Sequence, residues 1–161
     1  MTTTKKVLIV GGLVLVGYLI ITAEKLMKMK AIFEQMTLAP FSIPKNIKLI
    51  NHNSFGIPTT ISFDIDVKME NPTGDDFAVS GQVATLKKID ISYNGKFIGT
   101  ANVSIIEISV PNHNSLILHD IHVEVAISNA LSNISELMNM DMNKITITGV
   151  IDVLGVNYNI G

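Results

Sequence analysis

The sequence predicts an all-β fold, an antiparallel β-sandwich, with an N-terminal transmembrane helix ahead of it. Three observations support this fold class. From residue 46 onward, apolar and polar residues alternate in short runs, which is the pattern of half-buried strands. Turn-forming residues separate these runs about every ten residues, as in sandwiches and barrels. Ahead of them, residues 7–23 contain no charged side chain.

The composition narrows the possible classes of function. Charged residues make up 16% of the 161 residues, against about 25% in a typical soluble domain, so part of the chain is not expected to face water. The formal net charge is −2 and all 12 basic residues are lysines, which gives no electrostatic case for a nucleic-acid partner. Cysteine is absent, which excludes disulfides, thiolate catalysis and cysteine-type zinc sites.

We expect residues 1–23 to form a single-pass membrane helix with the lipid bilayer as its partner. As a helix, residues 7–23 rise about 25 Å, which is slightly short of the hydrocarbon core but within the usual range for a span. The flanking lysines are too evenly divided to set an orientation. Two alternatives remain open: a cleavable signal peptide that ends at Ala23, and a helix buried against protein. The expected anchor side chains are Val7, Leu8, Ile9, Val10, Leu13, Val14, Leu15, Val16, Leu19, Ile20 and Ile21.

Residues 24–45 are expected to form a helical stalk and then a linker. Leu26, Met29, Phe33 and Met36 recur at heptad spacing and form a narrow apolar stripe. The stripe predicts either contact with another protein, such as a homo-oligomer, or a stalk whose apolar edge rests on the membrane or on its own domain. Two prolines, at positions 40 and 44, end the helix because proline removes a backbone donor and disfavours a helical conformation before it.

The folded domain is placed at residues 46–161, and its clearest strand spans residues 59–70. In this strand the odd-numbered residues from 61 to 69 are apolar and the even-numbered residues from 62 to 70 are polar. Pairing must stop at Pro72, which lacks a backbone N–H, and Asn71 can start the turn by bonding to the main chain. The other expected strands are residues 48–53, 86–93, 96–103, 105–110, 115–127 and 144–153, with a short return segment that begins at Phe77 and a final short strand after Gly155.

Two further segments have a definite expected structure. Asn94-Gly95 lies between two strand patterns and predicts a tight hairpin, because both residues accept positive φ. Residues 129–138 are the only helical pattern in the domain. In the long strand 115–127, the odd-numbered residues from 117 to 127, His119 among them, are expected to share the apolar face.

A strand that ends in Asn71-Pro72-Thr73, followed by the Tyr93-Asn94-Gly95 hairpin and a long alternating strand, resembles the LEA type 2 family, also described as the WHy domain. The resemblance covers roughly residues 46–160. It implies an immunoglobulin- or fibronectin III-like sandwich, often tethered by an N-terminal membrane helix or lipid and linked to stress protection and membrane-associated binding. It implies no catalytic residues. Two departures are Gly74-Asp75-Asp76 in the first loop and residues 112–114 before the long strand.

The histidines and aspartates are the side chains most able to carry chemistry. His119 and His122 are three residues apart on a strand, which places their rings on opposite faces, so they are not expected to share a metal ion. Asp64 and Asp66 share one face, but that face is an ordinary solvated row. Asp75 and Asp76, with Asn71, supply oxygen ligands of the kind calcium prefers, without EF-hand spacing. We therefore expect no catalytic residues, no metal site and no cofactor.

The sequence thus predicts a non-enzymatic, membrane-anchored module with a structural or binding role. Its expected location is a membrane, with the lipid bilayer and other proteins as partners. The alternative is a minor membrane-associated structural protein of a bacteriophage virion, because related domains also occur in phage genomes and a small, cysteine-free, anchored sandwich suits that role.

Overall fold

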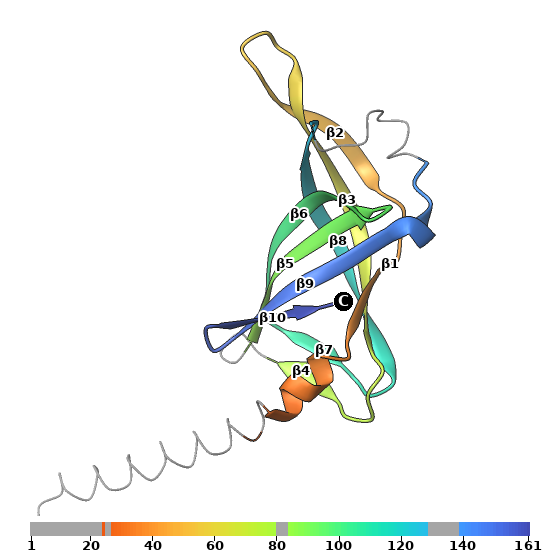
Figure 1. The fold of residues 1–161 in the computed structure, drawn as a ribbon, viewed down its shortest axis with the longest axis vertical. Helices are drawn as coiled ribbons and strands as arrows, with labels where there is room; N and C mark the ends of the chain where they lie inside the picture. Colours follow the sequence, from red (N-terminus) through yellow and green to blue (C-terminus); the bar gives the residue numbers. More distant parts are fainter. Residues whose placement is uncertain (1–23, 25–26, 80–83, 129–138) are drawn as a thin grey trace, which may run out of the picture.

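The computed structural model describes residues 24, 27–79, 84–128 and 139–161. Strands dominate this part of the chain (Figure 1), and the strand pairs are antiparallel. The predicted antiparallel all-β class is therefore confirmed. The elements are β1 (Thr37–Pro40), β2 (Lys45–His52), β3 (Pro58–Asn71), β4 (Phe77–Val79), β5 (Ala84–Tyr93), β6 (Lys96–Ile105), β7 (Ile108–Val110), β8 (Asn114–Ala126), the 3-10 turn η1 (Met142–Lys144), β9 (Ile145–Val153) and β10 (Val156–Ile160).

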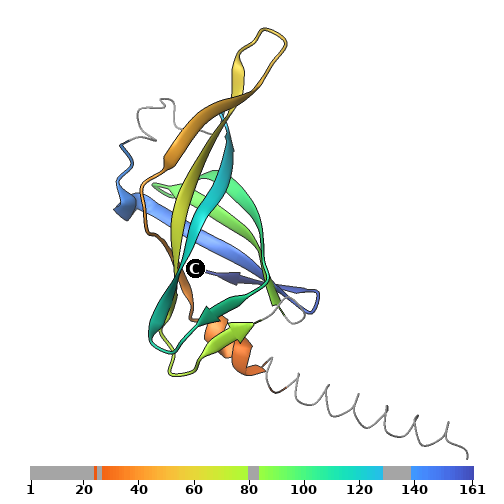
Figure 2. The ribbon, with the colours of Figure 1, turned by 180° about the vertical axis from the view of Figure 1, so that it is seen from behind.

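Eight strands form one sheet that folds over on itself. Its order is β1-β3-β8-β6-β5-β9-β10, with β2 paired to β3 beyond β1, while β4 and β7 form a small separate sheet. Strands β6 and β8 meet at a single register pair, Thr100 with Glu124. The sheet bends at this junction into two sandwich-like layers, β1-β2-β3-β8 and β6-β5-β9-β10 (Figures 1 and 2).

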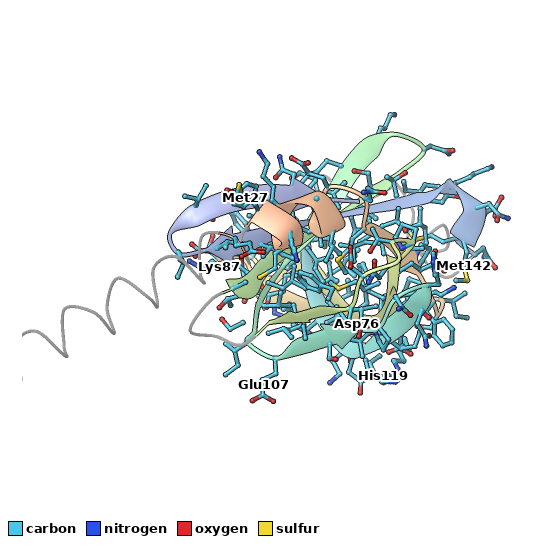
Figure 3. All side chains as sticks on the ribbon, turned by 90° about the horizontal axis from the view of Figure 1, so that it is seen from below. Met27, Asp76, Lys87, Glu107, His119 and Met142 are labelled. Atoms are coloured by element: carbon cyan, nitrogen blue, oxygen red, sulfur yellow. The ribbon has the colours of Figure 1, made fainter. Side chains whose placement is uncertain are left out.

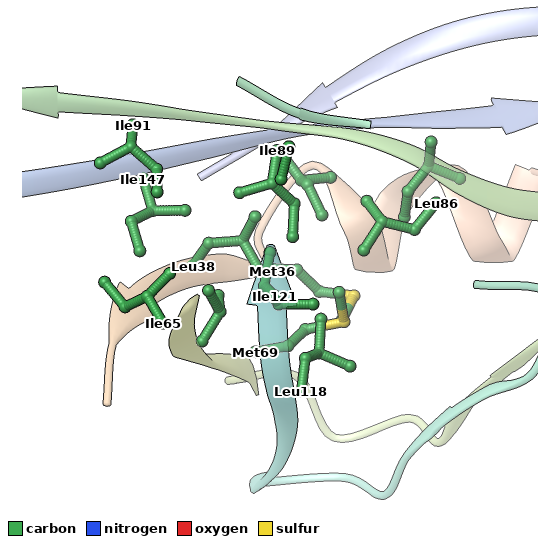
Figure 4. Close-up of a cluster of buried hydrophobic side chains, with 14 of the residues drawn as sticks. Met36, Leu38, Ile65, Met69, Leu86, Ile89, Ile91, Leu118, Ile121 and Ile147 are labelled. Atoms are coloured by element: carbon green, nitrogen blue, oxygen red, sulfur yellow. The ribbon is translucent and has the colours of Figure 1, made fainter. Parts of the chain in front are cut away.

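The apolar rows of the two layers meet in the core. Side chains of β5 and β9, such as Ile89 and Ile147, point toward Leu38 of β1 and toward Met69 and Ile121 in the other layer (Figure 4). The buried apolar face predicted in β3 is confirmed, since its odd-numbered residues from 61 to 69 are at most 1% exposed. The other face is less solvated than predicted, because Ser62 and Asp66 are also buried. At the layer junction, a Cβ on Gly99 would lie 2.5 Å from Val125 Cγ2, so only glycine allows β6 to approach β8 this closely.

Strand β8 departs from the predicted alternation at one point. Ile65 of β3 pairs with Ile121, but Val67 pairs with Leu118, so two residues of β8 oppose one residue of β3. The extra residue makes a β-bulge in which Asp120 has φ +53°. The expected position of His119 on the apolar face is wrong, because the bulge reverses the phase and leaves His119 exposed at the periphery of the molecule (Figure 3).

The segment before the sheet packs against the domain. Residues 27–33 are helical, and the side chains of Met29, Ile32, Phe33 and Met36 belong to the buried core. The ring centroids of Phe33 and Tyr158 of β10 are 4.8 Å apart. Of the two interpretations of the apolar stripe, its described residues thus fit an edge that rests on the chain's own domain. Met27 lies on the outer surface and is 70% exposed (Figure 3).

Part of the segment expected to be a linker is sheet instead. Residues 37–40 form β1, which pairs with β3 from Thr37 opposite Glu70 to Pro40 opposite Val67. Proline is tolerated there because Pro40 is the last residue of this short strand. The β-structure therefore begins nine residues before residue 46, with Thr37 (46 − 37 = 9).

Two predicted helices lie outside the described residues: the membrane helix, with all of its expected anchor side chains, and the helix over residues 129–138. Within the described part of the chain, none of the helices has the length and apolar character needed to cross a membrane.

Candidate functional site

The Asn71 corner, which we define as residues 71–76 and 110–114, joins the end of β3 to the loop between β7 and β8. The side chain of Asn71 is 1% exposed. Its Nδ2 donates to the carbonyl oxygens of Asp75 at 2.8 Å and Val110 at 3.0 Å. Its Oδ1 accepts from the backbone N–H of Thr73 at 3.1 Å and from the Thr73 hydroxyl at 2.7 Å. Both ends of the buried carboxamide are therefore used within the corner.

Further bonds hold the two loops of the corner together. The backbone N–H of Asn112 donates to Asp76 Oδ1 at 2.9 Å, and its side-chain amide donates to the carbonyl oxygen of Gly74 at 3.3 Å. The N–H of His113 donates to the carbonyl oxygen of Thr73 at 3.1 Å. These bonds join the loop of residues 74–76 to the loop of residues 112–114.

Two of the side-chain oxygens considered as calcium ligands accept hydrogen bonds within the corner. The side-chain oxygen of Asn71 faces Thr73, and Asp76 Oδ1 accepts the N–H of Asn112. In the described ranges, no three histidine, aspartate or glutamate side chains lie close enough together to hold one metal ion. Asp75 and Asp76 instead line a hollow of about 220 Å³ beside Met29 and Ile32 of the helix.

A larger open hollow, of about 470 Å³, lies beside the corner. It is lined by the end of β3 (Lys68, Glu70, Asn71 and Pro72) and by residues 113–115. Lys68 and Glu70 form an ion pair with each other. Among the residues that the structure describes, no buried side-chain nitrogen or oxygen lacks a hydrogen-bond partner. The hollow therefore offers a mixed polar surface without an unsatisfied group aimed at a ligand.

Of the five residues singled out by the family resemblance, the structure brings Asn71, Pro72 and Thr73 together but not the other two. Asn94 and Gly95 have φ of +50° and +74° and close the predicted β5–β6 hairpin. The N–H of Asn94 donates to the carbonyl oxygen of Lys144 in η1, at 3.0 Å. The hairpin thus lies beside η1 and contributes nothing to the Asn71 corner.

A second polar group, which we call the Asp66 cluster, lies on the outer face where β2, β3 and β8 meet. Asp66 is 8% exposed. Its Oδ1 accepts the backbone N–H of Asp120 at 2.9 Å and lies 3.1 Å from Lys45 Nζ. Lys45 Nζ also lies 2.8 Å from Asp120 Oδ1. The hydroxyl of Ser42 accepts the N–H of Asp66 at 2.9 Å.

Two histidines border the cluster on the same outer face. His122 Nδ1 lies 2.8 Å from Asp64 Oδ1, and His119 Nδ1 lies 3.7 Å from Asp66 Oδ1. The predicted placement of their rings on opposite faces is wrong, because the bulge at Asp120 inserts one residue between them and changes the alternation. They nevertheless approach different carboxylates, and both side chains are more than half exposed.

The contacts of the cluster shift the pKa values of three groups. Hydrogen bonds from the Asp120 amide and then from Lys45 lower the pKa of Asp66 below 3.8. Hydrogen bonds from Asn46 and then His122 lower the pKa of Asp64 below 3.8. The hydrogen bonds to Asp120 and Asp66 raise the pKa of Lys45 above 10.5. All three groups are therefore held in their charged forms, as in a structural ion network.

Asp64 and Asp66 were predicted to form an ordinary solvated row, and the structure corrects this for Asp66, which the bulge of β8 and the Lys45 side chain cover. Lys45, Ser42 and Asp120 were missed by the sequence reasoning. One signal was present in the sequence: apolar residues change from the even-numbered Leu116 and Leu118 to the odd-numbered Ile121 and Val123. Such a change of phase within one strand indicates a bulge.

Comparisons with known proteins do not identify a family. No protein-family model matches the chain, and no curated protein matches it. One solved structure, described as a crystal structure of a protein from Archaeoglobus fulgidus, is 12% identical, with 72% of this chain and 88% of that chain covered and a TM-score of 0.28. A likeness of this size carries no argument about the role of this chain.

Proposed function

We propose that this chain is a non-enzymatic, membrane-anchored β-sandwich of immunoglobulin or fibronectin III type, with a structural or binding role like that of LEA type 2 stress-protection proteins. The Asn71 corner carries the proposal. Asn71 and Thr73 belong to the motif on which the resemblance rests, and their side chains bond within the corner. Side chains that bond to their own loops hold those loops in place and are not free to act on a substrate. The motif therefore supports a structural role more than a catalytic one.

The electrostatics of the Asp66 cluster support a role without catalysis. A general base that works near neutral pH is most effective with a pKa near that pH. The pKa values of Asp64 and Asp66 are instead lowered by their hydrogen bonds. The carboxylate of Asp66 is also occupied by an N–H donor and an ammonium group. These groups are suited to fastening β2 and β8 to β3.

The proposal is tested by localisation and by a protection assay. Membranes from the native source are washed with alkaline carbonate, and the chain is expected to stay with the lipid. Vesicles loaded with a trapped dye are then dried and rehydrated with the reconstituted chain or with an equal mass of albumin, and the chain is expected to reduce leakage more than albumin.

Three results would contradict the proposal. Release of the chain by carbonate would contradict the proposed membrane anchor. Protection no better than that of albumin would contradict the proposed role in stress protection. A fixed copy number in purified virus particles would assign the chain to a virion instead. An enzymatic turnover that Asp66→Asn abolishes in a folded variant would show that the chain is an enzyme.

A further inference from the structure

The hairpin between β2 and β3 extends beyond the rest of the domain (Figures 1 and 2). Its end carries exposed apolar side chains. We define its tip as residues 53–57. Phe55 is 86% exposed, the highest value among the large hydrophobic side chains that the structure describes, and Ile57 is 59% exposed. Leu49 of β2, 44% exposed, adds to the same hairpin. A cluster of exposed apolar side chains at a protruding point indicates a contact surface.

Between residues 46 and 63, the hairpin itself carries basic side chains and no acidic ones. Residues 35–63 contain no aspartate or glutamate, and Lys48 and His52 are the only ionisable side chains between residues 46 and 63. The Lys48 side chain is exposed and forms no ion pair within the described part of the chain. Glu124 of β8 pairs with Ser62, the residue that Lys48 also pairs with, so the carboxylate-free part of the surface is the end of the hairpin beyond this level. An end without carboxylates, with a lysine at its base and aromatic and aliphatic side chains at its apex, is complementary to an anionic lipid surface.

Four of the five backbone N–H groups of the tip donate hydrogen bonds within it. Asn53 Oδ1 accepts the N–H groups of Phe55 at 2.9 Å and Ile57 at 3.0 Å. The N–H of Gly56 donates to the carbonyl oxygen of Asn53, and the N–H of Asn53 donates to that of Ile57, both at 2.9 Å. An unpaired N–H is costly to remove from water. These four bonds lower the cost of moving the tip into a poorly hydrated layer.

The size of the tip favours lipid over a protein partner. A stable protein interface buries about 800 Å² on each side, which a five-residue apex does not supply. A bilayer sets no such minimum, because acyl chains and headgroups close around each inserted side chain. A second copy of this chain would face the same shortage of area and would bring two Lys48 side chains toward each other.

We propose that the tip inserts into the surface of an anionic bilayer, with Phe55 and Ile57 at the acyl boundary and Lys48 at the phosphates. The tip lies at the end of the domain opposite the helix of residues 27–33 (Figures 1 and 2). The bilayer it meets is therefore a second one, apart from the membrane that holds the N-terminus. The inference of a second bilayer rests on the proposed N-terminal anchor, whereas the contact between the tip and lipid does not.

Tryptophan fluorescence tests the proposal, because the chain contains no tryptophan. The full chain with Phe55→Trp is reconstituted in phosphatidylcholine vesicles and mixed with acceptor vesicles of phosphatidylglycerol and brominated phosphatidylcholine. The emission is expected to shift to shorter wavelength and to be quenched by the bromine. The matched control is Phe97→Trp, which replaces a phenylalanine 51% exposed at the β5–β6 hairpin, and its emission is expected to stay unchanged.

The charge of Lys48 is tested in the same assay. Because one basic side chain near an anionic surface contributes about 1 kcal/mol, Lys48→Gln in the Phe55→Trp background should weaken the interaction with acceptor vesicles about fivefold. Lys96→Gln, beside Phe97, should leave it unchanged. Equal quenching by acceptors made only of neutral lipid would overturn the proposed recognition of anionic lipid.

The remaining outcomes separate this proposal from the anchor. Absence of quenching by all acceptors would overturn the lipid contact. A blue shift that grows with protein concentration in the absence of acceptors would also overturn it, because such a shift would show that a second copy of the chain covers the tip. Quenching only when the bromine is in the host bilayer would overturn the second-bilayer clause. If alkaline carbonate strips the chain from the host vesicles, the anchor fails. The released chain is then mixed directly with the acceptors, and the same fluorescence reads the tip alone.

Discussion

Asp120 donates its backbone N–H to the carboxylate of Asp66, at 2.9 Å, across 54 residues of sequence. Asp120 is the bulged residue of β8, and Asp66 is the residue of β3 that faces the bulge. The same carboxylate lies 3.1 Å from Lys45 Nζ at the start of β2. One largely buried acidic side chain thus fastens three strands, and it accepts a hydrogen bond from the bulge that exposes His119.

Acid should destabilise the protein through this contact. The hydrogen bonds of Asp66 and Asp64 lower both pKa values below 3.8, so the two groups contribute stability that is fully present above that value and is lost as the pH falls through the lowered pKa values. The urea midpoint, followed by circular dichroism, is expected to stay level above about pH 5 and to fall below it.

Two variants test whether Asp66 causes this pH dependence of stability. Asp66→Asn should lower the midpoint at neutral pH and flatten its acid dependence, because one of the titrating groups is gone. Asp75→Asn changes an exposed carboxylate outside the Asp66 cluster and should keep the dependence of the parent chain. An unchanged acid slope in Asp66→Asn would show that the contact does not control stability.

Removing the Asn71 side chain should destabilise the Asn71 corner and lower the free energy of unfolding. Asn71→Ala leaves the buried carbonyl oxygen of Val110 and the N–H of Thr73 without their partner. A buried group that loses its partner costs about 1–3 kcal/mol, so the unfolding free energy is expected to fall by about 3 kcal/mol. The measurement is urea unfolding of the full chain in mild detergent. Asn159→Ala, on the exposed side of β10, should change it by less than about 0.5 kcal/mol; equal losses in the two variants would refute the role of the corner.

Local patterns predicted the parts of this fold that depend on a few neighbouring residues. The alternation of β3, its end at Pro72 and the Asn94-Gly95 turn are of this kind, because period-two burial, a missing N–H and positive φ are local properties. The Asp66 cluster is different. Its contacts depend on the register of β2 and β8 against β3, and on Asp120 adopting a conformation that is uncommon outside glycine.

The helix before the sheet also shows that local patterns do not predict contacts between distant residues. The spacing of Met29, Phe33 and Met36 predicted an apolar edge, but spacing does not say what covers such an edge. In the structure, Phe33 meets Tyr158, which is 125 residues away by number (158 − 33 = 125). The strand over residues 37–40 could not be told from a linker by sequence. Its proline ends the preceding helix whether the residues after that helix form a loop or a short strand.

Gly99 should be intolerant of a side chain. A Cβ there would lie 3.1 Å from the backbone oxygen of Glu124, as well as 2.5 Å from Val125, and backbone cannot move aside without separating β6 from β8. Gly99→Ala is expected to lower the unfolding free energy by about 1–3 kcal/mol, the usual cost of overpacking. Gly74→Ala is the matched control, because its Cβ would meet only His113, at 3.9 Å. Thermal unfolding that is equally unaffected in both variants would show that the two layers do not approach at Gly99.

The helix of residues 27–33 should contribute to the stability of the whole domain. Phe33 is 1% exposed against β10, whereas Met27, earlier in the same helix, is 70% exposed. Truncation of a buried phenylalanine costs about 3–5 kcal/mol, so Phe33→Ala should lower the urea midpoint of the β-sheet signal, and Met27→Ala should not. A stalk that stands apart from the sandwich predicts the opposite: Phe33→Ala would change the helical signal and leave the unfolding of the sheet where it was. Circular dichroism of the two variants, recorded through the same urea titration, distinguishes these structures, because the shift in the sheet transition measures whether Phe33 and Tyr158 share one cooperative core.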